Sequence, residues 1–280
     1  MSTSPHAACV VGWPISHSRS PLIHNYWLKH YGIAGAYRSE AVPPEKFAAF
    51  VKSLPAHGYV GANVTVPHKE VALACSAPDE RARAVGAANT LWLDATGQLR
   101  STNTDVEGFL GNLDACAPDW SDGLRRAVVL GAGGAARAVV YALIERGITD
   151  IAVINRSRDR AEALRQRLSA GLRVLSWDER DLALGDADLL VNTTTLGMYG
   201  QPELALAVER LPAHAIVSDL VYVPLLTPLL AAAKARRLRS SDGLGMLLHQ
   251  AVRGFALWFG QKPEVTPELR ALVEADLSAR

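Results

Sequence analysis

The chain has 280 residues, of which 49% are hydrophobic and 20% are charged. This composition excludes an intrinsically disordered chain and predicts a sizeable buried core, and the length favours two domains. Because 29 Lys and Arg residues nearly balance 28 Asp and Glu residues, the net charge is +1, and we expect no nucleic-acid partner and no binding to an anionic membrane surface.

Cysteine usage and the N-terminal sequence predict a cytoplasmic protein. Cys9, Cys75 and Cys116 lie far apart and form no CxxC pair, which disfavours a disulfide framework and a zinc site and favours a reducing compartment. Residues 1–6 are polar and predict no signal peptide. The longest apolar windows, such as residues 138–144, are much shorter than the ~18 residues that span a bilayer, so we expect a soluble chain.

Short strands and helices alternate along the first hundred residues. The expected strands are residues 8–11, 37–41 and 59–66. The expected helices are residues 20–31, 44–54, 67–74 and 79–85. Residues 89–94 and 98–101 flank a turn at Ala95-Thr96-Gly97, which predicts a hairpin.

A second alternation follows a helix expected at residues 105–116 and a polar linker at 119–125. The expected strands are residues 127–130, 151–154, 189–192 and 216–221. The expected helices are residues 134–146 and 158–170, with good helix formers at 231–235 and a final helix at 243–260 that follows a loop at 239–242. Alternating strands and helices predict a parallel sheet with helices on both faces, so the expected fold class is α/β.

The turn after the strand at 127–130 predicts a dinucleotide site. Its sequence, Gly131-Ala132-Gly133-Gly134-Ala135-Ala136, satisfies G-x-G-x-x-[G/A] between a strand and a helix. The glycines permit a tight turn and a close approach of the backbone to a diphosphate, which the N–H groups of the helix N-terminus would bind. The alternative is a glycine-rich turn that serves packing alone.

The end of the next strand favours NADP over NAD. An NAD site carries an Asp or Glu about 20 residues after the glycines, where it binds the ribose 2′-hydroxyl. Here Asn155, Arg156 and Ser157 occupy that region, and Arg160 follows in the next helix. Guanidinium and hydroxyl groups suit a 2′-phosphate. The alternative is that Ser157 caps a helix whose arginines are only solvated, and we expect Asp159 on the following helix turn, away from the ribose.

Three polar clusters in the first half are candidates for the chemical site. Ser18 and Ser20 lie where a helix begins, and they either cap that helix or bind a small oxyanion at its N-terminus. Lys69 lies in the first turn of a helix, where the dipole disfavours a cation, and it is either an exposed surface lysine or a proton-transfer group. Asp105 is either an N-cap or a carboxylate that orients Lys69, and spacing alone does not place the two together.

These clusters, taken with further motifs, resemble the shikimate dehydrogenase family. The matching segments follow the family's order and cover essentially the whole chain, so the set is far more specific than any one motif. They are residues 12–21 (GWPISHSRSP), 63–69 (NVTVPHK), 86–90 (GAANT), 103–105 (NTD), 131–135 (GAGGA), 155–157 (NRS), 192–198 (NTTTLGM), 219–222 (DLVY) and 242–250 (DGLGMLLHQ).

The resemblance implies a reversible, NADPH-dependent reduction of 3-dehydroshikimate to shikimate in chorismate and aromatic amino acid biosynthesis. It implies that Lys69 and Asp105 form the catalytic pair, in which Lys69 gives a proton to the C3 oxygen and Asp105 positions Lys69 and binds a substrate hydroxyl. The implied substrate-binding residues are Ser18 and Ser20 for the carboxylate, Thr65, Asn89 and Gln250 for the ring and its hydroxyls, and Tyr222 over the carboxylate side.

The resemblance also implies a set of cofactor-binding residues. They are Gly131, Ala132, Gly133, Gly134, Ala135, Asn155, Arg156, Ser157, Arg160, Thr193, Leu220 and Gly243. Among these, Arg156 and Arg160 would bind the 2′-phosphate, and Gly243 would approach the nicotinamide by its backbone. No metal is expected, because a ketone that accepts hydride needs only a proton donor and orientation. His17, His24, His68 and His249 match no catalytic position of the family.

The implied architecture has two domains with an active-site cleft between them. Residues 1–105 would form an α/β substrate-binding domain, residues 106–242 a Rossmann-like, doubly wound NADP domain, and residues 243–280 C-terminal helices that return to the substrate domain. We expect a monomer or a homodimer.

Three alternatives differ from this prediction. A quinate/shikimate dehydrogenase that uses NAD usually carries an acid near position 155 and a Thr in place of the second serine, so Asn155 and Ser20 argue against it. A metabolite-sensing relative without turnover would lack Lys69 or Asp105, and both are present. A generic NADP-binding reductase would leave the motifs of the first hundred residues unexplained.

Overall fold

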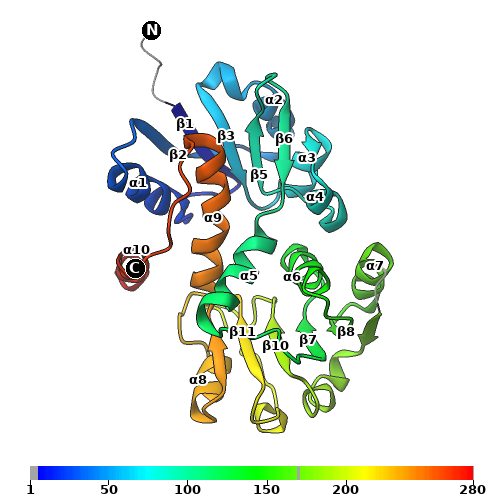
Figure 1. Cartoon of the computed structure of the whole chain (residues 1–280). Coiled ribbons are helices and arrows are strands. Elements are labelled where there is room, and N and C mark those ends of the chain that lie inside the picture. The colour runs from blue at the N-terminus through cyan, green and yellow to red at the C-terminus, as the bar shows by residue number, and fades with distance from the viewer. Residues whose placement is uncertain (1–5, 169–170, 280) are drawn as a thin grey trace. The chain divides into compact units, whose positions relative to one another are not determined.

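Two six-stranded sheets organise the part of the chain that the computed structural model describes, residues 6–168 and 171–279 (Figure 1). Residues 1–104 and 250–280 form one compact unit, and residues 105–249 form the other. The first unit is therefore discontinuous in sequence, and the division falls inside helix α9 (Gly243–Phe259). Residues 1–5 and 169–170 lie outside the described residues. Two expectations fall on them: the absence of a signal peptide and the end of the helix at 158–170.

The first sheet is mixed, with strand order β2-β1-β3-β5-β6-β4. Its strands are β1 (His6–Gly12), β2 (Gly35–Ala41), β3 (Tyr59–Val64), β4 (Ala77–Pro78), β5 (Thr90–Leu93) and β6 (Leu99–Thr102). β1 pairs in parallel with β2 and β3, whereas β5 runs antiparallel to β3 and β6. The predicted hairpin is confirmed as β5 and β6, and because it reverses the chain the sheet is mixed and not entirely parallel. The ends of β1, β3 and β6 and the start of β5 meet at one edge.

Helices cover both faces of the first sheet. They are α1 (Ser20–His30), α2 (Pro44–Lys52), the 3₁₀ helix η1 (Leu54–His57), α3 (Lys69–Ala74), α4 (Glu80–Val85), the end of α9, and α10 (Pro267–Ser278). On one face Phe47 and Val51 of α2 pack on the strands, and on the other Tyr37 packs with Trp258 of α9. The Trp258 indole donates a hydrogen bond to the Leu91 carbonyl (2.9 Å) and fills the space that a Cβ at Gly61 would need.

The second sheet is entirely parallel, with strand order β12-β11-β10-β7-β8-β9. Its strands are β7 (Arg126–Leu130), β8 (Asp150–Ile154), β9 (Leu172–Leu175), β10 (Leu189–Asn192), β11 (Ile216–Asp219) and β12 (Arg239–Ser241). Numbered from β7, this is the 3-2-1-4-5-6 order of the doubly wound Rossmann sheet. The unit's helices are α5 (Asp105–Cys116), α6 (Gly134–Glu145), α7 (Arg158–Leu168), α8 (Pro228–Ala235), the start of α9, and the 3₁₀ helices η2 (Trp177–Glu179), η3 (Leu182–Leu184) and η4 (Val208–Arg210).

The central strands of the second sheet are buried on both faces. Most residues of β7, β8, β10 and β11 are apolar, and all except the first residues of β7 and β8 are buried, which is the pattern of a parallel sheet covered by helices on each side. On one face Val128 and Leu190 pack with Leu229 of α8. This core fixes the position of β7, and the glycine turn lies at the carboxyl end of that strand.

Two expectations near the end of the chain are wrong. Residues 239–242, expected as a loop, contain β12, a three-residue edge strand whose first two residues are exposed. The helix at 243–260 is not the last one, because α10 follows it with Thr266 as its N-cap. Among the described residues, no helix is long and apolar enough to cross a bilayer.

Candidate active site

The glycine turn after β7 has the conformation that a diphosphate site needs. Gly131 has a φ of +109°, and a Cβ there would lie 2.5 Å from Thr193 Oγ1, so only glycine fits. The N-cap of α6 is Gly133, and no side chain caps this helix. Around Gly133 a Cβ would meet nothing within 4 Å. The first N–H groups of α6 are therefore presented to an anion without a competing side chain.

The end of β8 carries cationic side chains where an NAD site would carry an acid. Asn155 is half-buried, and its Nδ2 donates to the Ser157 carbonyl (2.8 Å), which shapes the turn into α7. Arg156, Ser157 and Arg160 are exposed. Within the described residues, neither Arg156 nor Arg160 has an ion-pair partner, whereas Arg158 pairs with Glu162 (3.5 Å).

Three further predicted cofactor residues lie at the ends of neighbouring strands. Thr193 follows β10, and its hydroxyl donates to the Leu130 carbonyl at the end of β7 (2.6 Å). Leu220 follows β11, and its N–H donates to the Asn192 carbonyl (3.0 Å). Gly243 opens α9, and a Cβ there would overlap the Leu220 carbonyl, so close backbone packing is itself a reason for this glycine.

A buried cluster of hydrogen-bonded side chains joins these strand ends. No sequence pattern assigns it a role. The Asp219 carboxylate accepts hydrogen bonds from Asn192 Nδ2 (2.9 Å), Thr227 Oγ1 (2.7 Å) and the Val221 N–H (3.1 Å). Burial raises the pKa of Asp219, and these hydrogen bonds oppose the rise. The motifs contain Asn192 and Asp219, but only the structure brings them together, between β10 and β11.

In the first unit, the loop after β1 positions the two predicted serines. The Trp13 N–H donates to the Val66 carbonyl (3.1 Å) and the Thr65 N–H to the Val11 carbonyl (2.9 Å), so this loop is joined to the end of β3. Arg19 holds the N-cap position of α1, without a side-chain cap. Ser18 Oγ accepts from the N–H of Ser20 (3.3 Å). Ser18 thus contributes to the helix start, although neither serine is its N-cap.

Arg19 anchors this loop to the end of the chain. Its Nη1 donates to the His17 carbonyl (2.6 Å), and its Nε lies 2.6 Å from Asp276 Oδ2 of α10. The Arg19 side chain is 10% exposed, so its charge is turned away from solvent and toward α10. The backbone between Ser18 and Ser20 is held from both sides as a result.

Lys69 is the first residue of α3, as the sequence predicts, and it is half-buried. Its N-cap, His68, makes no side-chain cap, and the Lys69 carbonyl accepts from the Ala88 N–H (2.9 Å). Thr65 lies just after β3, and Asn89 just before β5. The structure therefore brings Thr65, Lys69 and Asn89 to the same edge of the first sheet.

Asn89 is fixed by the segment that leads to Asp105. Its Oδ1 accepts hydrogen bonds from the Thr104 N–H (2.7 Å), Thr104 Oγ1 (3.2 Å) and Thr90 Oγ1 (3.2 Å). Asn103 Nδ2 donates to the Ala87 carbonyl (3.0 Å). Asp105 follows Thr104, opens α5 in the second unit and is buried. Its pairing with Lys69 stays a prediction.

The remaining predicted substrate residues, Tyr222 and Gln250, are both half-buried. Tyr222 follows β11 in the second unit, and Gln250 lies on α9 in the first. Two of the four histidines that match no catalytic position are core residues. His68 stacks on Phe47 (ring centroids 4.3 Å apart) and contacts the Val42 carbonyl, and burial lowers its pKa. His24 is fully buried, and burial lowers its pKa to about 3 against a smaller opposing effect of Asn63.

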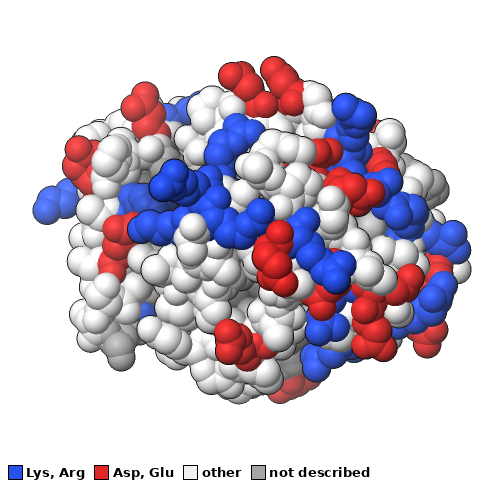
Figure 2. Space-filling model, turned by 90° about the horizontal axis from the view of Figure 1, so that it is seen from below, with Lys and Arg blue, Asp and Glu red and all other residues white. Residues whose placement is uncertain are grey.

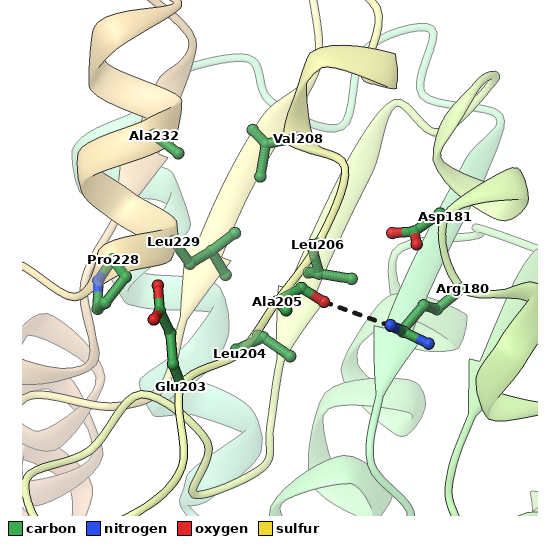
Figure 3. A pocket seen from close by; sticks show the side chains of 10 residues that line it. All are labelled: Arg180, Asp181, Glu203, Leu204, Ala205, Leu206, Val208, Pro228, Leu229 and Ala232. Carbon is green, nitrogen blue, oxygen red and sulfur yellow. Dashed lines mark hydrogen bonds between the residues drawn. The ribbon is translucent and has the colours of Figure 1, made fainter.

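A pocket of about 320 Å³ lies elsewhere in the second unit (Figure 3). Leu204, Leu206 and Leu229 line it together with the charged residues Arg180 and Glu203. The Arg180 side chain donates to the Ala205 carbonyl (3.3 Å) at its margin. None of the predicted site residues lines this pocket. Across residues 6–168 and 171–279, no group of three or more His, Cys, Asp or Glu side chains could hold a metal ion.

Three family models match most of the chain. A shikimate dehydrogenase substrate binding domain matches residues 10–91, a shikimate/quinate 5-dehydrogenase matches 119–199, and a shikimate 5′-dehydrogenase C-terminal domain matches 243–272.

Individual proteins agree with these models. The chain is 64% identical over 280 residues, 100% of both chains, to "Shikimate dehydrogenase (NADP(+))" of Rhodopseudomonas palustris (strain TIE-1). It is similar to the structure of shikimate 5-dehydrogenase from Thermus thermophilus in complex with NADP(H) and shikimate, with a TM-score of 0.82, 35% identity and coverage of 98% and 99% of the two chains. It is also similar to quinate dehydrogenase from Corynebacterium glutamicum in complex with NAD, with a TM-score of 0.89, 30% identity and coverage of 98% and 100%.

A Rossmann-order unit with a glycine turn after its first strand defines a dinucleotide-dependent oxidoreductase, and the relatives show that the dinucleotide is NADP. The matching family models and the 64% identity over the full length identify the family within this class. The chain belongs to the shikimate dehydrogenase family.

Proposed function

We propose that the chain catalyses the reversible NADPH-dependent reduction of 3-dehydroshikimate to shikimate, a step of the shikimate pathway. The observation that carries this proposal is the gathering of Thr65, Lys69 and Asn89, with the loop that holds Ser18 and Ser20, at one edge of the first sheet. Hydroxyl, amide and ammonium groups there suit a small polyhydroxylated carboxylate. The Rhodopseudomonas relative, which the chain matches over its full length, supports the same reaction.

In this proposal Lys69 and Asp105 are the catalytic residues. Lys69 gives a proton to the C3 oxygen of the ketone in reduction and takes it back in oxidation. Asp105 orients the Lys69 ammonium and binds a substrate hydroxyl. Ser18 and Ser20 bind the substrate carboxylate, Thr65, Asn89 and Gln250 bind the ring and its hydroxyls, and Tyr222 covers the carboxylate side. Reduction of the ketone requires one hydride and one proton, so no metal is needed.

The residues of the second unit fit NADP. When bound, the cofactor supplies or accepts the hydride. The uncapped start of α6 and the open space at Gly133 suit the diphosphate, and these residues belong to the segment Gly131-Ala132-Gly133-Gly134-Ala135. Arg156 and Arg160 are exposed cations without carboxylate partners in the described chain, and with Asn155 and Ser157 they would hold the 2′-phosphate. Thr193, Leu220 and Gly243 would line the remainder of the nucleotide site.

A quinate dehydrogenase that uses NAD is the second candidate. The observation in its favour is the TM-score of 0.89 against the Corynebacterium glutamicum enzyme. A fold comparison does not discriminate between the two activities, because the choice of nucleotide depends on a few side chains at the end of β8. There Asn155 and Arg156 stand where an NAD enzyme carries an acid.

The direct test is absorbance at 340 nm with the purified chain and four substrate pairs. Shikimate or quinate is supplied with NADP or with NAD. We expect fast turnover only with shikimate and NADP. Faster turnover with quinate and NAD would favour the second candidate, and no turnover with any pair would contradict both.

We also propose a cellular location and an assembly state. Cys9, Cys75 and Cys116 form no disulfide with one another, which suits a reducing, cytoplasmic compartment. Lys and Arg side chains gather in one area of the face in Figure 2, with Asp and Glu side chains around it. A monomer or a homodimer is the proposed assembly, and light scattering at several protein concentrations would distinguish the two.

A further inference from the structure

Asp219 is a buried carboxylate whose recorded partners are all electrically neutral. It is the last residue of β11 and is 1% exposed. Its oxygens accept from the Asn192 amide, the Thr227 hydroxyl and the Val221 N–H. Within residues 6–168 and 171–279, no ion pair joins it to a Lys, Arg or His. The positive end of α8, whose N-cap is Thr227, offsets only part of a unit charge.

The hydrogen bonds around Asp219 have the pattern of an ionised carboxylate. Asn192 Oδ1 accepts from the N–H (3.0 Å) and the hydroxyl (2.7 Å) of Thr194, so the nitrogen of that amide faces Asp219 as a donor. Thr227 Oγ1 accepts from the Leu230 N–H (3.2 Å) and gives its own proton to Asp219 Oδ2. A protonated carboxyl group would compete with that hydroxyl proton for the same contact.

The contacts by themselves do not require a charge. A buried carboxylate without a cation lowers the stability of a fold, because its lost hydration is not fully replaced. An asparagine of the same shape could accept from Asn192 and Val221 through its oxygen and donate to Thr227 Oγ1 through its nitrogen. The chain therefore carries a charge that a purely structural cluster could omit.

The carboxylate lies at the end of the sheet where a nucleotide would bind. Ligands of doubly wound sheets bind outside the carboxyl ends of the strands, and Val221 and Thr227, which hold Asp219, both follow the end of β11. The glycine turn follows β7, and the residues proposed for the 2′-phosphate follow β8, so the nicotinamide half would extend over β10 and β11, on the other side of β7 (Figure 1). A ring there would be about 10 Å from Asp219, three residue lengths of a strand.

We propose that the buried charge of Asp219 favours the oxidised nicotinamide ring, which carries a positive charge, over the reduced ring, which is neutral. This inference rests on the proposed function. Asp219 need not touch the nucleotide. In ketone reduction the hydride passes to the carbonyl carbon and Lys69 gives its proton to the oxygen, so positive charge develops on the ring that loses the hydride. A fixed negative charge nearby stabilises that change.

The test titrates nucleotides into the full chain in the absence of substrate. Calorimetry at neutral pH gives the Kd for NADP+ and for NADPH, and melting temperatures report the fold. Asp219→Asn removes the charge and keeps the shape of the cluster. Thr227→Val is the matched control, because it removes one hydrogen bond to the same carboxylate and the cap of α8 but keeps the charge.

Asp219→Asn should weaken the binding of NADP+ relative to NADPH by about 5- to 20-fold, the effect of one unit charge about 10 Å away at an effective dielectric constant of about 20. Its melting temperature should equal or exceed that of the wild type, because an unpaired buried charge is removed. Thr227→Val should lower the melting temperature and leave the ratio of the two Kd values within about twofold.

An unchanged ratio in Asp219→Asn, or an equal change in Thr227→Val, would overturn the inference, because the cluster would then act through its shape alone. A failure of Asp219→Asn to fold would also overturn it, since the charge would then serve the fold. Both outcomes leave the proposed reaction intact, because the titrations need no substrate. A wild-type chain that binds neither form of the nucleotide would instead remove the proposed function and this inference with it.

Discussion

Lys69 occupies a place that a purely structural lysine would avoid. It begins α3, where the N-terminal end of a helix disfavours positive charge, and it is half-buried. The proposed proton transfer to the ketone would give a cation at this position a chemical role.

Replacement of this lysine tests that role. Lys69→Ala should lower kcat by roughly 100-fold or more and change the KM for shikimate little, because general acid catalysis acts on the transition state. Lys52→Ala, at the last turn of α2, is the control and should leave kcat unchanged. Stopped-assay rates at saturating substrate measure the difference, and a Lys69→Ala enzyme with full kcat would exclude the lysine from the chemistry.

Arg156 and Arg158 are two exposed arginines that differ in their partners. Arg158 pairs with Glu162, and Arg156 has no ion-pair partner in the described residues. Arg156→Ala should therefore raise the KM for NADP by roughly tenfold or more, with a much smaller effect on NAD, because a guanidinium–phosphate pair is lost. Arg158→Ala should change both constants little. Equal effects of Arg156→Ala on NADP and NAD would contradict the phosphate assignment.

Sequence motifs indicate the polar residues of the site, but they do not indicate which other side chains fix the positions of those residues. The family resemblance points to Ser20 and Asn89, whereas no pattern marks Tyr37, whose link to Asn63 crosses β1. Sheet order decides which strands are neighbours, and a single sequence does not state sheet order. The cluster of Asp219, Asn192 and Thr227 escaped prediction for the same reason.

At the level of elements, the two glycines in the turn between β7 and α6 serve different purposes: one allows the backbone to fold, and the other leaves space for a ligand. Gly131 has a positive φ and a close neighbour in Thr193, whereas the space around Gly133 is open and its φ is −85°. The two glycines thus meet different demands within one turn.

Two alanine variants would resolve these demands. Gly131→Ala should destabilise the fold by about 1–3 kcal/mol, the cost of a strained backbone position. Gly133→Ala should leave the melting temperature nearly unchanged and raise the KM for NADP, because a methyl group would stand where the diphosphate approaches. Thermal melts and nucleotide titrations measure both quantities, and a loss of stability in Gly133→Ala alone would reverse the assignment.

Long periodic elements were predictable and short edge elements were not. The strands and helices from 127 to 154 agree with the structure to within a residue or so. β12 is polar and three residues long, and two of its residues are exposed, so no hydrophobic periodicity predicts it. α10 did carry a usable signal, since Thr266 followed by Pro267 is a typical helix start.

For the molecule as a whole, the free energy of unfolding should depend on pH through its buried histidines. The pKa of His24 falls from 6.5 to about 3 on folding, and burial also lowers the pKa of His68 and His249. Between pH 6.5 and 3 the unfolded chain binds a proton at His24 that the folded chain does not. Stability is therefore fully present above this window and is lost as the pH falls through it.

His24→Phe keeps an aromatic ring in the stack on Tyr37 and removes the titrating group. Relative to wild type, this variant should gain stability as the pH is lowered below 6.5, by up to about 1.4 kcal/mol for each pH unit. Urea midpoints from pH 7 to pH 4 would show the two curves diverging. Parallel curves over this range would mean that His24 does not contribute to acid sensitivity.

The discontinuity of the first unit bears on how a ribosome delivers this protein. Its sheet lacks Trp258, which occupies the space at Gly61, until residues 250–280 have been synthesised. The second unit is uninterrupted and emerges in full before that. We therefore expect the nascent chain to complete its later half first, with the opening hundred residues waiting, incompletely covered, for a segment made long after them.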